Sequence, residues 1–474
     1  MSSISSTLVG ASSALDAFQY ALSVTQNNID NASTPGYAKQ TVDLQSDPFD
    51  PAAGLGGGVS QGPLLDSRDL LAESDVWQQA GAQGDASAQL SALTAVQNAV
   101  PVSAGGGIPA ALSTFFNDVS AWSAAPTSGS AQQSVLVAAG SLAQSFQATA
   151  AGVASASTSV GQDIGSTVGQ INQLTTQVAG LNAQIQSGGE HDEGLQAQLY
   201  SSLETLSGLV NIGVLHQPDG GVNVTLSSGA ALVMGSQSYA LTSANAAVGG
   251  PSADPQAPPD IDIQAADGSV VNGQITSGSL AGLLQVRNVT IPGLIGDSGQ
   301  PGALNLLATQ IAGDVNGIVS QGSTSPGAAP GGMGLFTVNA ASASSAAATF
   351  AVNPGMTASQ LPPVDQNGVP NGVPLAIAAL ANSAPASLGS AGYTTFYGNN
   401  AALVGSQLNQ ANSNQTLTAQ TLAQAQSMRQ TVSGVSLDAE ATNVLQFQED
   451  YQAVAKMVTT LDTLMQSLID MIPD

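Results

Sequence analysis

Apolar residues recur every seven positions at both ends of the chain, and this spacing constrains the fold more than any other feature. One repeat lies within residues 4–29 and the other within residues 437–472. Heptad spacing sustained over three or more repeats is typical of helices that pair along an apolar seam. The N-terminal seam comprises Ile4, Leu8, Ala11, Leu15, Phe18, Leu22 and Ile29. The C-terminal seam comprises Leu437, Val444, Phe447, Tyr451, Val454, Val458, Leu461, Met465, Leu468 and Ile472.

Each seam needs an apolar partner, and the simplest partner is the other seam. The alternative is that two unrelated amphipathic helices pack separately on a globular core. The C-terminal helix is expected to begin after Ser436 as N-cap, with Glu440 close enough for a partial capping arrangement. Pro473 is expected to end it.

The N-terminal helix runs into a marked corner. The stretch "NNIDNASTPGYAKQ" covers residues 27–40, and its Asn-rich first half weakens the helix before Pro35 forbids simple continuation. An aromatic residue follows directly, in a chain that is only 4% aromatic. We therefore treat Asn31, Thr34, Pro35, Gly36 and Tyr37 as a corner motif.

Charge and composition exclude several classes of partner. The 474 residues carry a formal charge of −26, with only five Lys and Arg residues. Such a surface repels phosphate and lacks a basic face, so neither a nucleic acid nor an anionic membrane is an expected partner. The chain has no cysteine, which excludes disulfides and thiolate metal sites. No cleavable signal peptide and no apolar run of about 18 residues is visible.

Between the seams the pattern changes from helix to strand and back. Residues 67–100, 110–122 and 131–209 have helical spacing, with a break near "SGGEHDEG", whereas residues 31–66 look irregular and turn-rich. From about 210 to 275 the apolar period becomes two around Asp-Gly and Ser-Gly turns, which predicts hairpins. A helical stretch follows, then Gly/Pro/Ala-rich text to about 390, then helix to the end.

The expected fold is therefore mainly α with a β-containing middle, in an elongated multidomain chain with paired terminal helices. The expected divisions are a terminal coiled-coil region (1–34 with 436–474), a helical rod domain (35–209 with 395–435) and a β-rich outer domain (210–394).

No group of residues predicts catalysis, a cofactor or a metal. "EHDE" at 190–193 fits a solvated loop better than a cation site, and His216 fits an ordinary surface residue. "GLGGGVSQG" lacks the strand, Lys and acidic follow-up of a phosphate loop, so it is interpreted as a flexible turn. Asp260, Asp262 and Asp267 lack calcium-loop spacing. Trp77, Trp122 and Tyr37 are expected to be core or subunit contacts.

Both ends of the chain resemble the bacterial flagellar axial proteins. The N-terminal evidence is "ALSVTQNNIDNASTPGYAKQ", a helix ending in an Asn-rich run and a Thr-Pro-Gly-Tyr corner. The segment "SGVSLDAEATNVLQFQEDYQAVAKMVTTLDTLMQSLIDMI" resembles the end of the hook–filament junction members of that family, apart from Phe447 and Val454. In the middle, "QPDGGVNVTLSSGAALVMG" and "SGSLAGLLQVRNVTIPGL" are also similar to junction members.

This resemblance implies a non-enzymatic structural subunit that joins the hook to the filament by helix pairing and lateral packing. It implies contacts with the hook protein, the second hook–filament junction protein, further copies in a ring and an export chaperone. It also implies type III export to an extracellular flagellum and terminal segments that order on assembly. Alternatives are another axial protein, such as a flagellin or a hook protein, or a secreted adhesin or enzyme domain within residues 210–390.

Overall fold

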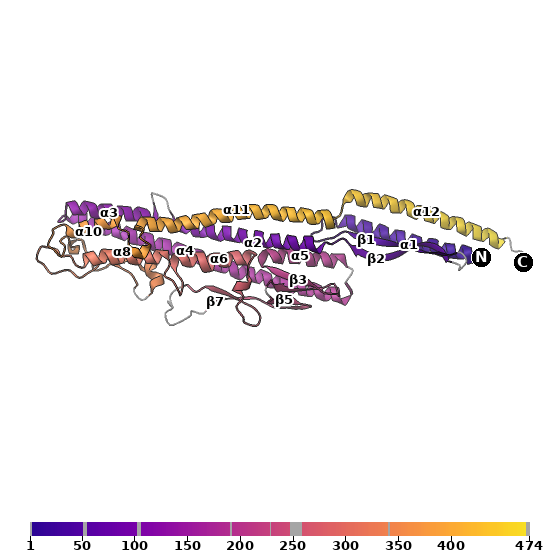
Figure 1. Ribbon diagram of the computed structural model, residues 1–474, viewed down its shortest axis with the longest axis horizontal. Helices are drawn as coiled ribbons and strands as arrows, with labels where there is room; N and C mark the ends of the chain where they lie inside the picture. The colour runs from indigo at the N-terminus through magenta and orange to yellow at the C-terminus, as the bar shows by residue number, and fades with distance from the viewer. Residues whose placement is uncertain are drawn as a thin grey trace.

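The computed structural model describes residues 2–50, 55–101, 106–189, 192–227, 229–246, 258–339 and 342–470. The molecule is elongated, with α1 and α12 side by side at one end and α3 and α10 at the other (Figure 1). We call the first end the terminal arm and the remainder the body. The arm consists of α1 (Ser2–Asp30), β1 (Gln40–Asp50), β2 (Leu55–Asp66) and α12 (Leu437–Asp470).

Long helices form the frame of the body. They are α2 (Leu70–Ala99), α3 (Gly107–Ala124), α4 (Gly129–Gln184), α5 (Glu193–Leu209) and α11 (Tyr393–Ser433). Side-chain caps begin three of them: Asp69 accepts from the first-turn amides of α2, Ser128 from α4 and Asp192 from α5. The helices close over fully buried large side chains, among them Trp122, Phe115, Phe146, Ile164 and Ile171.

The β-containing middle packs against α4. A four-stranded antiparallel sheet has the order β3-β4-β5-β6, and a separate antiparallel pair joins β7 to β8. Val222, Val224 and Leu226 alternate into the core from one strand, as the period of two predicts. The strands are β3 (Ile212–His216), β4 (Val222–Leu226), β5 (Ala231–Met234), β6 (Gln237–Ser238), β7 (Thr242–Asn245) and β8 (Ile261–Gln264).

Shorter elements complete the body between the sheet and α11. The helices are α6 (Ser279–Gln285), α7 (Ile291–Ile295), α8 (Ala303–Val319), α9 (Ala346–Thr349) and α10 (Gly372–Ala379), and β9 (Phe336–Thr337) pairs with β10 (Ala351–Val352). Single turns are η1 (Ile185–Gly189), η2 (Asn272–Gln274), η3 (Val286–Thr290), η4 (Ala343–Ser345), η5 (Ala358–Gln360), η6 (Leu380–Asn382) and η7 (Ala386–Leu388). The mainly α class with a β-containing middle and paired terminal helices is confirmed.

The prediction that residues 31–66 are irregular holds for residues 31–39, which form turns and coil, but is wrong for residues 40–50 and 55–66. There β1 and β2 form a long antiparallel hairpin that lies along α1, and residues 55–62 of the glycine-rich stretch expected to be a flexible turn belong to β2. The hairpin is stabilised by packing that is not local in sequence. A Cβ at Gly10 of α1 would overlap the Gly57 carbonyl oxygen, so two glycines allow the helix and the strand to touch.

No single helix in the described ranges is long and apolar enough to cross a membrane. The bent pair of Gly372–Leu388 and Tyr393–Ser467 meets the same length and composition criteria only when its two parts are taken together.

Candidate assembly site

The terminal arm buries small side chains and leaves large ones partly exposed. On α1 the buried positions are Ala11, Ala14, Ala17, Ala21 and Val24. Small residues allow close approach of the neighbouring hairpin and α12, but each supplies little apolar area. The arm therefore holds together in one chain without building a core of large side chains.

Both predicted seams lie only partly covered in the single chain. Apart from the buried Ala11, the N-terminal seam residues Ile4, Leu8, Leu15, Phe18, Leu22 and Ile29 are half-buried. In the C-terminal seam Val444, Phe447, Val454, Val458, Leu461 and Met465 are half-buried, and Leu437 and Tyr451 are exposed. Ile472 and the side chain of Leu468 lie outside the described residues, as does Pro473. Beside the seam, Met457, Leu464 and Ile469 are more than half exposed.

The corner motif forms a hydrogen-bonded turn after α1. The Asn31 side-chain amide donates to the Asn27 carbonyl oxygen at 3.0 Å, and the Thr34 hydroxyl donates to Asn31 Oδ1 at 3.1 Å. The Tyr37 hydroxyl lies 3.1 Å from Asn27 Oδ1 and 3.0 Å from Asn28 Oδ1. The Asn-rich run thus does more than weaken the helix, because its amides hold the corner in place.

Gly36 brings this corner against the body. Its φ is +76°, a conformation that strains other residues, and a Cβ there would overlap the Ala197 carbonyl oxygen of α5. α1 ends at Asp30, before Pro35, and Gly36 permits the close approach of the corner to α5.

Asn28 connects the two terminal helices to the hairpin. It is fully buried, and its amide donates to the Gln40 carbonyl oxygen at 2.8 Å and to Glu440 Oε2 at 3.1 Å. The Gln40 backbone N–H donates back to Asn28 Oδ1 at 2.9 Å. Glu440 Oε1 also pairs with Lys39 Nζ at 2.9 Å, so the expected capping role of Glu440 gives way to an ion pair.

Arg68 makes a buried ionic centre between arm and body. Its Nη2 pairs with Glu193 and its Nη1 with Glu73 at 3.2 Å, and Nη1 also donates to the Gly36 carbonyl oxygen at 2.9 Å. The guanidinium carbon lies 3.9 Å from the centre of the Tyr200 ring, a cation–π contact. Planar guanidinium can serve several such partners at once, which a lysine could not.

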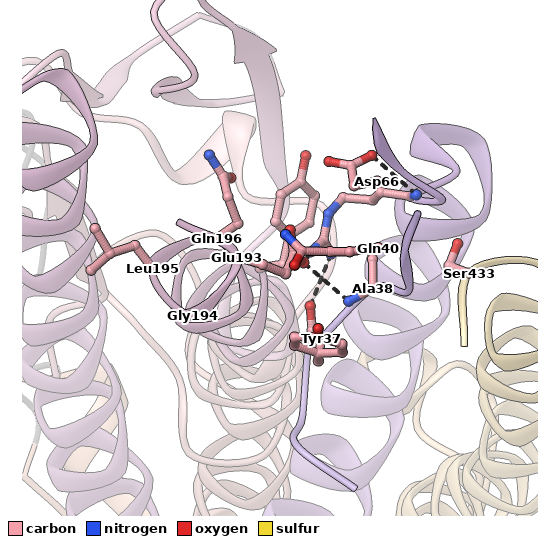
Figure 2. A network of polar contacts seen from close by, with 12 residues as sticks. Tyr37, Ala38, Gln40, Asp66, Glu193, Gly194, Leu195, Gln196 and Ser433 are labelled. Atoms are coloured by element: carbon pink, nitrogen blue, oxygen red, sulfur yellow. Dashed lines mark hydrogen bonds and ion pairs between the residues drawn. The ribbon is translucent and has the colours of Figure 1, made fainter. Parts of the chain in front are cut away.

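Glu193 reaches from the first turn of α5 to the corner. Figure 2 shows its carboxylate directed towards Ala38, whose backbone N–H donates to Glu193 Oε1 at 3.0 Å. Asp192 caps the same helix by accepting from the Gly194 and Leu195 amides. The expectation that residues 190–193 form a solvated loop is therefore wrong for Glu193. Glu190 and His191 lie outside the described residues.

Arg429 adds a second ionic contact from α11. Its Nη1 pairs with Glu73 Oε2 at 3.0 Å and with Glu204 Oε2 at 2.7 Å. At the end of α11 the Ser433 carbonyl oxygen accepts from the Lys39 backbone N–H at 2.9 Å. We call this group of Asn28, Lys39, Arg68, Glu73, Glu193, Glu204, Arg429 and Glu440 the joint. Three of the five cationic residues of the chain lie in it.

Burial displaces the titration of several groups near the joint. Burial raises the pKa of the Glu193 carboxyl, and the charge of Arg68 opposes that rise. Burial, with the charges of Glu193 and Glu440, raises the pKa of Tyr37 to about 12. Burial and the charge of Arg68 lower the pKa of His216. The displaced pKa values therefore reflect the burial of these side chains where the arm meets the body.

His216 is exposed, as expected of a surface residue, and it also contacts a tyrosine of α5. Its Nε2 lies 2.8 Å from the Tyr200 hydroxyl, and burial raises the pKa of Tyr200 to about 12 although Arg68 opposes the rise. Trp77 and Trp122 are buried in the body, in agreement with a packing role. No group of three or more His, Asp or Glu side chains that could hold a metal ion occurs among the described residues.

No local sequence motif marks the joint. Arg68, Glu193 and Arg429 are widely separated along the chain, so no local motif reveals them. The one sequence feature that could have located it is the small number of Lys and Arg residues, because cations this rare in an acidic chain are expected to lie beside buried carboxylates.

Comparison with known proteins gives this arrangement a class. The N-terminal helix and corner match a family described as "Flagella basal body rod protein" over residues 10–37. The C-terminal helix matches "Flagellar basal body rod FlgEFG protein C-terminal" over residues 426–471. Paired termini of this kind define a flagellar axial protein.

The body specifies the family. Residues 93–336, more than half of the chain, match the family described as "Flagellar hook-associated protein FlgK helical domain". The chain belongs to this flagellar hook-associated protein family.

Individual relatives agree. The chain is 26% identical to flagellar hook-associated protein 1 of Bacillus subtilis (strain 168), covering 98% of this chain and 99% of that relative. It is 27% identical to flagellar hook-associated protein 1 of Salmonella typhimurium, covering 60% of this chain and 52% of the relative. The flagellar hook junction protein FlgK from Burkholderia pseudomallei is 27% identical, with a TM-score of 0.48 over 56% of this chain and 46% of that one.

Proposed function

We propose that the chain is a structural subunit that joins the flagellar hook to the filament. The proposal rests on the apolar surface that the arm leaves exposed. Its apolar residues Tyr451, Met457, Leu464 and Ile469 are exposed or mostly exposed, along helices that already pair with each other. Neighbouring subunits in a tubular assembly would cover that surface, and burial of each large side chain is worth about 1.5–3 kcal/mol.

The joint supports the same proposal mechanically. A subunit in a tube has to transmit force from the arm to the body, and a single corner of chain would bend easily. Buried ion pairs through Arg68 and partly exposed ion pairs through Arg429 connect the corner, α2, α5 and α11. Because removing one partner leaves an uncompensated buried charge, this contact resists opening.

The proposed partners follow from this position in the flagellum. They are the hook protein, the second hook–filament junction protein, further copies of the chain in a ring and an export chaperone, outside the cell after type III export. The proposed role is architectural, and no reaction is assigned to the chain. We retain the three-part division of the sequence with one adjustment: the hairpin of residues 40–66 lies along α1 and is assigned to the arm.

Deletion of the gene in the source bacterium tests the proposal. Cells without the chain are expected to keep their hooks, lose their filaments and release unpolymerised flagellin into the medium, and the intact gene should restore filaments. Normal filaments in the deletion strain would contradict the proposal. Long filaments grown from the purified chain alone would favour a flagellin or hook protein instead.

A further inference from the structure

A groove of about 700 Å³ lies beside the joint, between α2 and the edge of the four-stranded sheet. Leu70, Ser74 and Trp77 line it from α2, and Ile212, Val214 and His216 line it from β3. β3 is the outermost strand of its sheet in the described part of the chain. The groove is therefore bounded along one side by a strand edge.

The register of the sheet directs backbone groups into this groove. The Gln217 N–H donates to the Gly221 carbonyl oxygen at 2.8 Å at the turn between β3 and β4. In an antiparallel pair, alternate residues bond to the partner strand and the others face away from it. Counting back from Gln217, the N–H and C=O groups of Ile212, Val214 and His216 face away from β4 and towards the groove.

Trp77 adds a donor that lacks a partner. Its side chain is 9% exposed, and its Nε1 has no hydrogen-bond partner among the described residues. An indole N–H only donates, so the missing partner is an acceptor such as a peptide carbonyl oxygen. Leaving a buried donor unsatisfied is costly, and an incoming backbone carbonyl would remove that cost once the indole ring shifts enough to expose its buried Nε1 to the groove.

We propose that this groove receives β2 of a second copy of the chain, which adds to β3 as a further strand. The inference rests on the proposed function, because it assigns a contact to subunits packed in the assembly. β2 pairs only with β1 among the described residues, and α1 touches it at the Gly57 carbonyl oxygen, so the proposed pairing uses the outer edge of β2 beyond Gly57. Figure 1 places the hairpin in the arm and β3 at the end of the body nearest the arm.

Charge selects β2 as the occupant. Copies with a net charge of −26 repel one another, so close contact is most favourable where both surfaces lack acidic groups. Residues 55–65 of β2 contain no charged residue, and neither does β3 apart from His216, whose pKa is lowered by burial. β1, by contrast, carries Asp43, Asp47 and Asp50.

Cysteine crosslinking tests the contact, because the natural chain has no cysteine. Two single variants, Gln61→Cys in β2 and Leu215→Cys in β3, replace exposed side chains. Cells expressing both are treated with a short thiol–thiol crosslinker after flagella have assembled. A crosslinked pair of chains is expected, whereas Gln61→Cys combined with Leu375→Cys, in α10 at the opposite end of the molecule, should give none.

Two further substitutions, each added to the chains that carry Gln61→Cys and Leu215→Cys, test how the groove would hold the added strand. Trp77→Phe keeps an aromatic ring stacked on Tyr200 but removes the donor, so crosslink yield should fall about fivefold. The purified monomer should lose only the stability that the smaller ring gives up in packing, since no existing hydrogen bond is lost, and yields are compared at a temperature where both monomers stay folded. Val214→Pro removes an N–H that faces the groove and should abolish the crosslink while the pairing with β4 remains.

The outcomes separate this inference from the proposed function. If filaments stay attached in the double-cysteine strain and the yield does not exceed that of the Leu375→Cys control, the β2–β3 contact is wrong and the junction role stands. If Trp77→Phe leaves the yield unchanged, the indole donor has no part in the contact and this account of the groove is wrong.

Discussion

The body and the arm are both built mainly from helices, yet they bury different kinds of side chain. In the body, Trp122, Phe115 and Phe146 are fully buried among aliphatic residues of α4. On α1 the buried apolar residues are alanines and one valine, and the large residues of α12 remain half-buried or exposed. Secondary structure alone therefore does not make a closed domain: the body closes its core within one chain, and the arm leaves part of its apolar surface exposed.

The free-energy cost of substitutions is expected to differ between the body and the arm in the same way. Large-to-small substitutions in a closed core cost several kcal/mol because they leave a cavity, whereas substitutions on a half-covered helix cost little in the isolated chain. The comparison therefore predicts that body variants lose monomer stability, that joint variants lose a connection, and that arm variants lose assembly.

The largest effect is expected in the body. Phe146→Ala removes a ring packed 4.9 Å, centroid to centroid, from Phe350, and should lower the free energy of unfolding by about 4 kcal/mol. Denaturant unfolding of the purified monomer measures it. Val137→Ala on the same helix is the control, since Val137 is 60% exposed and should change little. Equal effects of the two variants would show that α4 does not cover a closed core.

Substitutions in the joint are expected to give the second-largest loss of monomer stability. Arg68→Met leaves the buried carboxylates of Glu193 and Glu73 without their shared cation, at an expected cost of about 3 kcal/mol. Lys456→Met removes an exposed cation from α12 and is the matched control, with an expected change near zero. Calorimetry of the two variants checks this, and similar melting temperatures would mean that the ionic centre does not connect arm and body.

Gly36→Ala should cost about 2 kcal/mol, because it combines a strained positive φ with an overlap against the Ala197 carbonyl. The control is Gly165→Ala within α4, where a Cβ meets nothing within 4 Å. There the substitution should stabilise the helix by about 0.5–1 kcal/mol. Opposite signs in thermal unfolding are the expected result, and a stabilising Gly36→Ala would place the corner away from α5.

The smallest effect on the monomer is expected in the arm. Val458→Asp places a carboxylate on a half-buried seam position and should change monomer stability by no more than about 1 kcal/mol. In the assembly the same charge would be buried, so cells should release flagellin and swim poorly. Tyr451→Asp should behave alike, and exposed Thr459→Asp should be tolerated. A sharply destabilised monomer with normal motility would mean that the seam belongs to a private core.

Local patterns in the sequence predicted most elements of the fold. Heptad spacing gave α1 and α12, aliphatic residues such as Ile164, Val168 and Ile171 gave α4, and alternation gave β4. The β1–β2 hairpin was not predicted because its glycines are also typical of turns. Its strands are supported by a contact of Gly57 with Gly10, far away in sequence. Long-range packing overrode local propensity there.

The candidate site was predictable only in its local part. The corner motif could be located because Pro35 and Gly36 impose backbone geometry on their neighbours. The ionic centre could not, since Arg68 lies between β2 and α2, its partners Glu73 and Glu193 come from α2 and α5, and the three meet only after folding. The choice of Arg68 rather than another cation as its centre depends on three-dimensional proximity that spacing does not encode.

Hydrogen exchange of the backbone amides, compared between the free monomer and isolated hook–filament junctions, measures whether neighbouring subunits complete the arm. If neighbours complete the arm, amides of α12 should exchange much faster than those of α4 in the monomer. In the junction both helices should be strongly protected. Protection of α12 equal to that of α4 in the free monomer, with no gain on assembly, would contradict the account.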